Sequence, residues 1–326
     1  MPVHPPIDAR AAAILAGTLL LVLAGGHALA WSCSARVARA WTWTALVLGS
    51  GGVERLTTRA APGVRMVALI VFGLLTMKVL VVVEERARGM APLSFGAWLG
   101  FAGAWLGMRP LLFVAARAGP LPGAGVLLRR GATRVLQGAV LVGFARAAWV
   151  HTQSPGLVTV LLLPGLALLM LFGVCNLLAG AWRRRGVACD ALFRAPPRAQ
   201  SLSEFWSRRW NLAFSEMTVI AVYRPLVGRV GRGPAVMAGF ALSGVLHELA
   251  FSVPVRAGFG LPLLYFLLQG GLVLLERRLA RAGRPLRGWA GRAWAWFWLA
   301  APLPLLFHRP FLAGVVWPLI GRAPGE

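Results

Sequence analysis

Long apolar segments are the feature that most constrains this chain. Residues 11–30, 66–83 and 156–182 each approach or exceed the ~20 residues that a helix needs to cross the hydrocarbon core of a bilayer. Backbone amides in lipid must find hydrogen-bond partners within their own segment, so such stretches are expected to be helical. We therefore predict an all-α, polytopic transmembrane helical bundle.

The predicted spans, about eight to ten by the length rule, form a single membrane-embedded domain over residues 1–326. They lie at 11–30, 41–53, 66–83, 93–116, 135–150, 156–182, 234–254, 259–276 and 289–307, with a further apolar piece at 311–320. We divide the domain into an N-terminal helix set (1–182), a cytosolic or interfacial segment (183–233) and C-terminal helices (234–326). The first apolar run could be a signal peptide, but its length and the many spans after it favour a retained helix.

Charged residues are few, mostly positive and unevenly distributed along the chain. Charged residues make up 13% of the chain, about half the share of a soluble domain, yet the formal net charge is +24. Loops 54–65, 117–134, 183–233 and 277–292 hold 23 arginines, whereas the opposite loops hold six. This asymmetry predicts that the arginine-rich loops and the N-terminus lie in the cytosol. It also explains the basic composition without nucleic-acid binding. We expect an integral, multi-pass protein of a bacterial inner (cytoplasmic) membrane.

One histidine lies deep within a predicted span. His247 is about 13 residues into the segment that begins at Pro234, or roughly 20 Å from its cytosolic end. Ser243 shares its helical face, and Glu248 follows it directly. Ionisable residues at this depth are costly and often functional, although a histidine and a glutamate can also simply bridge helices. A neutral imidazole here suits general-base chemistry, and Glu248 could fix its tautomer.

The segment 183–233 is too apolar for a free linker and too long for a turn. Ser201 or Ser203 could cap a helix here, and Glu204 follows Ser201 by three residues, the spacing of a capping box. Trp206 and Trp210 follow among arginines, a pattern typical of an interfacial helix at the headgroup level. We expect the run after them to dip into the membrane without crossing it.

Asn211 is the second candidate for chemistry. Its amide offers donors and an acceptor, so it could orient a thioester carbonyl or help to stabilise an oxyanion. It could equally cap a helix or lie in a loop. Arg208 and Arg209, just before it, could bind the phosphates of an acyl donor or could lie at the membrane surface.

Three motifs occur in a recognisable order: SLSEFWSRRWN, then VYRPL, then SGVLHEL. Over about residues 192–279 the chain resembles the plant-type wax synthase branch of the membrane-bound O-acyltransferase (MBOAT) family. The resemblance implies an MBOAT-like fold and an enzyme that transfers a fatty acyl group from acyl-CoA to the hydroxyl of a lipid-like alcohol. It implies His247 as the general base and Asn211 as the second catalytic residue. Glu204 and Ser207 replace the Asp and Gly that are usual in the first motif.

The resemblance also shapes what we expect around these two residues. We expect substrate contacts from Trp206, Arg208, Arg209, Trp210, Ser243 and Glu248. The bilayer, acyl-CoA as co-substrate and a hydrophobic alcohol are the expected partners, with no nucleic acid, no permanently bound cofactor and no metal. Cys33, Cys175 and Cys189 show neither metal-ligand spacing nor a disulfide framework.

Two other function classes remain open from the residues. A membrane transporter or flippase also carries buried polar groups, although no inverted repeat is evident. An intramembrane hydrolase could use Ser243 and His247, although Ser243 lacks the GxSxG turn of serine hydrolases.

Overall fold

The computed structural model describes residues 9–321, and this part of the chain is built from helices without a β-strand. The predicted all-α bundle is confirmed. Among the described residues, four helical segments are long and apolar enough to cross a membrane: Ala9–Ser32, Pro62–Arg86, Pro155–Arg184 and Arg232–Val255. A fifth span is counted if Gly288–Leu306 and Arg309–Ile320, bent by 67°, act as one. The extreme N-terminus, which we predict to be cytosolic, lies outside the described residues.

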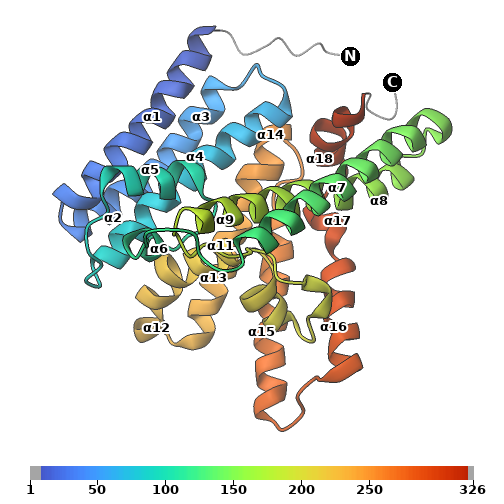
Figure 1. Cartoon of the computed structure of the whole chain (residues 1–326). Helices are drawn as coiled ribbons and strands as arrows, with labels where there is room; N and C mark the ends of the chain where they lie inside the picture. The colour runs from blue at the N-terminus through green and yellow to red at the C-terminus, as the bar shows by residue number, and fades with distance from the viewer. Residues whose placement is uncertain (1–8, 322–326) are drawn as a thin grey trace.

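The N-terminal helices form one group (Figure 1). It comprises α1 (Ala9–Ser32), α2 (Ala35–Thr44), α3 (Ser50–Leu56) and α4 (Pro62–Arg86). A π-helical turn, Ala45–Gly49, joins α2 to α3, so the predicted span 41–53 belongs to a longer helical stretch. Helix α4 packs against α1, α2 and α3, and its C-terminal half is almost wholly buried. This helix is therefore the core of the N-terminal group.

The predicted span 93–116 is not one helix. It is divided into α5 (Phe95–Ala104) and α6 (Leu111–Val114). Lys78, buried on α4, explains the break, because its ammonium group donates to the carbonyl oxygens of Phe101 and Trp105, each over 2.9 Å, and to that of Gly107. Carbonyls at a helix end lack partners within the helix, and a cation can satisfy them.

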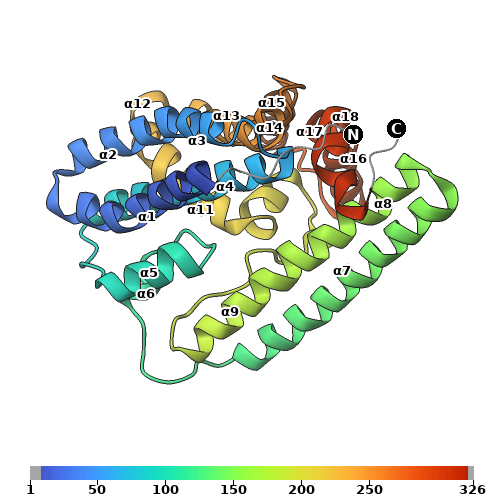
Figure 2. The ribbon, with the colours of Figure 1, turned by 90° about the horizontal axis from the view of Figure 1, so that it is seen from above.

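A long hairpin lies along one side of the molecule (Figure 2). Its arms are α7 (Ala124–Thr152) and the stretch formed by α8 (Pro155–Leu166), a π-helical segment and α9 (Cys175–Arg184). The arms approach closely at glycines: a Cβ atom added at Gly138 would lie 2.6 Å from the backbone nitrogen of Leu169. Small residues at such crossings allow close helix packing in membranes.

The C-terminal half carries the three sequence motifs. Its helices are α10 (Leu202–Glu204), α11 (Leu212–Thr218), α12 (Arg224–Val230), α13 (Arg232–His247), α14 (Val253–Val255), α15 (Leu261–Arg281), α16 (Gly288–Ala300), α17 (Leu303–Leu306) and α18 (Arg309–Phe311). Helices α13 and α15 pack side by side, and α11 contacts α13. A π-helical turn, Glu248–Ser252, joins α13 to α14 directly after His247. Such turns often occur at functional sites.

Candidate active site around His247 and Asn211

The imidazole of His247 is held by its own helix. Its Nδ1 atom lies 2.6 Å from the carbonyl oxygen of Ser243, one turn earlier on α13. A carbonyl oxygen only accepts, so Nδ1 must carry the proton of that bond. In the neutral ring, Nε2 then keeps a free lone pair, which is the form that accepts a proton.

Phenylalanine rings from three elements surround this imidazole. Its centroid lies 4.2 Å from that of Phe266 on α15, 5.5 Å from that of Phe251 and 5.9 Å from that of Phe214 on α11. Nε2 has no hydrogen-bond partner within residues 9–321, and His247 is only partly buried. Its lone pair is therefore not occupied by another group of this region.

Asn211 begins helix α11. Its backbone is left-handed (φ 41°), and its Oδ1 accepts a hydrogen bond from the N–H of Phe214 over 3.3 Å. Asparagine tolerates this backbone better than most residues, and its short side chain is well suited to capping. Because Oδ1 is the acceptor at the cap, the amide NH2 group is left to donate elsewhere.

The two predicted catalytic residues contact the same phenylalanine. The backbone N–H of Phe214 donates to the capping side chain of Asn211, and the ring of Phe214 contacts His247. The link is made by a residue that the sequence motifs do not single out. Its spacing of three after Asn211, the distance at which a cap acceptor meets its donor, was the available signal.

Trp206 is connected to the same group of rings. Its indole N–H donates to Oε1 of Gln269 over 3.1 Å, and its ring centroid lies 5.7 Å from that of Phe266. Gln269 is fully buried on α15 and also donates to the carbonyl of Trp298 over 2.6 Å. Gln269 is thus a second residue that sequence reasoning missed. It fixes the side of the first motif that faces Phe266.

Other residues of the first motif contact one another and the loop before it. Trp210 stacks on Phe205, with centroids 5.4 Å apart. The Arg209 guanidinium binds Glu204, with Nη2 and Oε1 2.6 Å apart. It also reaches the carbonyls of Arg194 and Ala195 over 3.3 Å each, so it ties the preceding loop to the motif. Arg208 is exposed and makes no ion pair within residues 9–321.

Glu204 completes the predicted capping arrangement. Its N–H donates to Ser201 Oγ over 2.9 Å, as the sequence predicts, but its carboxylate accepts from the N–H of Gln200 rather than of Ser201. Burial alone would raise the pKa of this carboxyl, yet the Gln200 N–H and the guanidinium of Arg209 together hold that pKa below its ordinary value.

Ser243 and Glu248 have partners within the helix packing. The Ser243 hydroxyl donates to the carbonyl of Gly239 over 3.0 Å, so it does not point its proton at His247. Glu248 accepts from the N–H of Leu263 over 3.0 Å and thereby caps the start of α15, while its Oε2 is buried without a partner in the described chain. The hydroxyl geometry argues against a Ser243–His247 hydrolase pair.

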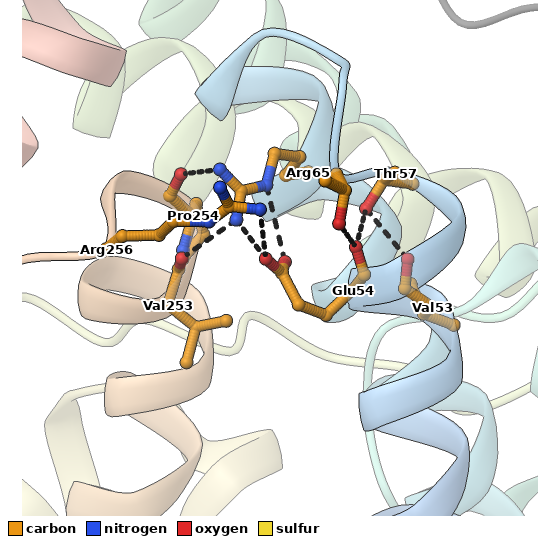
Figure 3. A network of polar contacts seen from close by, with 8 residues as sticks. Val53, Glu54, Thr57, Arg65, Val253, Pro254 and Arg256 are labelled. Carbon is orange, nitrogen blue, oxygen red and sulfur yellow. Dashed lines mark hydrogen bonds and ion pairs between the residues drawn. The ribbon is translucent and has the colours of Figure 1, made fainter.

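The helix that carries His247 is held at its far end by Arg65 of α4 (Figure 3). The buried guanidinium donates to the carbonyls of Pro254 and Val253, over 2.6 and 3.2 Å, and forms an ion pair with Glu54. Arg256, whose backbone is left-handed, lies 3.5 Å from the same carboxylate. A guanidinium at a helix C-terminus satisfies unpaired carbonyls and complements the helix dipole.

A known protein family matches the segment that holds both candidate residues, and curated proteins match about a third or less of the chain. Residues 189–268 match the profile of the membrane bound O-acyl transferase family. A probable long-chain-alcohol O-fatty-acyltransferase 6 of Arabidopsis thaliana is 31% identical over 111 residues, 32% of each chain. A long-chain-alcohol O-fatty-acyltransferase of Simmondsia chinensis is 34% identical over 73 residues, 20% of this chain and 21% of its own.

A third relative, the probable long-chain-alcohol O-fatty-acyltransferase 7 of Arabidopsis thaliana, is 36% identical over 121 residues, 32% of this chain and 35% of its own. The matches thus span about a third or less of the length of these curated relatives. Within residues 9–321, no three His, Cys, Asp or Glu side chains are grouped so that they could hold a metal ion. The predicted resemblance is confirmed: this chain is similar to plant long-chain-alcohol O-fatty-acyltransferases, and its residues 189–268, which include Asn211 and His247, match the membrane bound O-acyl transferase family.

Proposed function

We propose that this chain is a membrane-bound O-acyltransferase that moves a fatty acyl group from acyl-CoA to the hydroxyl of a lipid-like alcohol. The observation that carries the proposal is the state of His247. Its Nδ1 is bound to a backbone carbonyl and its Nε2 has no hydrogen-bond partner in the described chain, within residues 189–268, which match the membrane bound O-acyl transferase family.

The imidazole supplies the proton acceptor. Nε2 of His247 takes the hydroxyl proton of the alcohol while that oxygen attacks the carbonyl carbon of the thioester. The new C–O bond forms, the C–S bond breaks, and the thiolate of coenzyme A takes the proton back from the imidazolium. The hydrogen bond from Nδ1–H to the Ser243 carbonyl stabilises the imidazolium and leaves Nε2 as the nitrogen that accepts the proton.

Asn211 supplies the polar contact to the acyl donor. Its Oδ1 is occupied by the helix cap, so its NH2 group is the part free to donate to the thioester carbonyl oxygen. That oxygen gains negative charge as the alcohol attacks, and a fixed donor at that point lowers the barrier. The ring of Phe214 and those of Phe251 and Phe266 limit water near the imidazole, which protects the thioester from hydrolysis.

The arrangement in the membrane is part of the proposal. We place the arginine-rich loops and the N-terminus in the cytosol, where acyl-CoA would arrive, with the exposed Arg208 available to its phosphates. The hydrophobic alcohol would enter from the lipid. The matched relatives are plant proteins, so a bacterial inner membrane stays a prediction from the sequence.

The test is ester formation in membranes of a host that makes no neutral lipid esters. Membranes that contain the chain receive radiolabelled acyl-CoA and, in separate reactions, a long-chain alcohol, a sterol or a diacylglycerol, and lipid products are identified by mass spectrometry. We expect one new neutral ester. His151→Ala, at an exposed histidine of α7, should leave its formation unchanged. Correctly inserted protein that forms no ester with any alcohol would contradict the proposal.

A further inference from the structure

Helices α15 and α16 end in a hairpin tip that is strongly basic. Residues 277–292 contain no Asp or Glu and six arginines: Arg277, Arg278, Arg281, Arg284, Arg287 and Arg292. All six are exposed. Apart from a bond of Arg281 Nε to the carbonyl of Arg277 over 3.3 Å, their guanidinium groups have no hydrogen-bond or ion-pair partner in the described chain. Figure 1 shows that this hairpin projects away from the N-terminal helices.

Exposed apolar side chains lie directly beside these charges. Trp289, between Arg287 and Arg292, is 83% exposed. Phe297 on α16 and Leu275 on α15, on the helices that lead to the tip, are also exposed. A tryptophan beside arginines is typical of the boundary between hydrocarbon and headgroups, where the indole lies at the interface and the guanidinium reaches a phosphate.

We propose that the tip of the α15–α16 hairpin binds the headgroups of anionic phospholipids. Guanidinium groups bind phosphate oxygens in a two-pronged geometry, and several together are attracted to an anionic leaflet. A free phosphate ligand would need the arginines but not an exposed indole beside them, so Trp289 favours lipid over coenzyme A. Arg281 is 15 residues, or about 22 Å of helix, beyond Phe266, whereas the base of the hairpin contacts the first motif, where Glu276 accepts hydrogen bonds from the N–H groups of Leu202 and Ser203. Lipid binding here does not depend on the proposed acyl transfer.

The experiment measures binding of fluorescent phosphatidylglycerol to the full chain in detergent micelles. Competitors are unlabelled phosphatidylglycerol, phosphatidylcholine and coenzyme A. The test variant is Arg284→Gln/Arg287→Gln/Arg292→Gln, and the control, which removes the same charge from exposed positions of α7, is Arg129→Gln/Arg130→Gln/Arg134→Gln. Elution from a sizing column checks that both variants are folded.

We expect the test variant to bind phosphatidylglycerol at least about tenfold more weakly, and the control within about twofold of the unmodified chain. Phosphatidylglycerol should displace the probe, whereas phosphatidylcholine should not. Equal binding by the test variant and the unmodified chain would overturn the proposal. So would equal displacement by phosphatidylcholine. Displacement by coenzyme A at concentrations that match phosphatidylglycerol would instead assign the tip to the acyl donor and would also overturn it.

Discussion

Asn211 and His247 both contact Phe214. The N–H of Phe214 donates to Asn211 Oδ1 over 3.3 Å, and the ring of Phe214 lies 5.9 Å from the imidazole of His247, centroid to centroid. Helix α11, which Asn211 caps, therefore carries a residue that contacts both candidates. Their relative placement depends on this contact.

Shortening Phe214 should lower turnover. Phe214→Ala removes the ring that contacts His247, whereas the backbone N–H that donates to Asn211 remains. Loss of alignment of about an ångström can cost on the order of a hundredfold in rate, so we expect kcat to fall by about ten- to a hundredfold. Phe214→Leu, which keeps an apolar side chain there, should fall less. Steady-state kinetics of ester formation measures both, and equal rates for Phe214→Ala and the unmodified chain would contradict the alignment.

Arg65 should stabilise the C-terminal end of the helical segment that carries His247. Arg65→Gln leaves the carbonyls of Val253 and Pro254 without their cation and Glu54 without its main partner. Breaking a buried ion pair costs about 3 kcal/mol, so the detergent-solubilised protein should melt earlier. Amide hydrogen exchange should rise in residues 248–257. Arg59→Gln, at an exposed arginine of the turn that precedes α4, is the matched control and should alter neither measurement.

Glu216 should make stability depend on pH. Burial raises the pKa of this carboxyl above its ordinary 4.5, although the Arg109 guanidinium, 2.7 Å away, acts in the opposite direction. With a raised pKa the folded chain binds the proton more tightly than the unfolded chain. The contribution of this group to stability therefore falls as the pH rises from 4.5 through the raised value. Melting temperatures measured across that window should decline for the unmodified chain and decline less for Glu216→Gln. Parallel curves would show that Glu216 does not titrate in this way.

The close approach of the α7 hairpin arms should tolerate no side chain at Gly138. A Cβ atom there would lie 2.6 Å from the nitrogen of Leu169, so Gly138→Ala should separate the arms and lower the melting temperature. Gly143, also on α7, has no atom within 4 Å of an added Cβ. Gly143→Ala removes a helical glycine without a clash and should be neutral or slightly stabilising. Similar melting temperatures for the two variants would contradict the packing described.

The all-α bundle and the segment that carries Asn211 and His247 could be predicted from the sequence, because both predictions rest on local patterns of residues. Apolar length predicts helices in lipid, and the spacing from Ser201 to Glu204 predicts the cap that is observed. The break in the predicted span 93–116 was not foreseen. Lys78 is visible within an apolar run, but the carbonyls that it would satisfy depend on how α4 and α5 pack.

The residues around the imidazole were also harder to predict from the sequence, because their contacts depend on how the helices pack. Phe266 and Gln269 lie on α15, and each acquires its role only when that helix packs beside α13 and the first motif. Arg209 illustrates the converse. Its motif position predicts substrate contact, while its guanidinium is engaged by Glu204 and two backbone carbonyls. Which arginines contact a substrate therefore stays a prediction.

The most direct test is turnover of His247→Ala with the alcohol that the unmodified chain accepts. If Nε2 of His247 removes the hydroxyl proton, kcat should fall by at least about a hundredfold, while the KM for acyl-CoA should stay within about threefold. Protein yield in the membrane and the activity of His151→Ala provide the controls. A His247→Ala chain that forms ester at the unmodified rate would show that this imidazole is not the base.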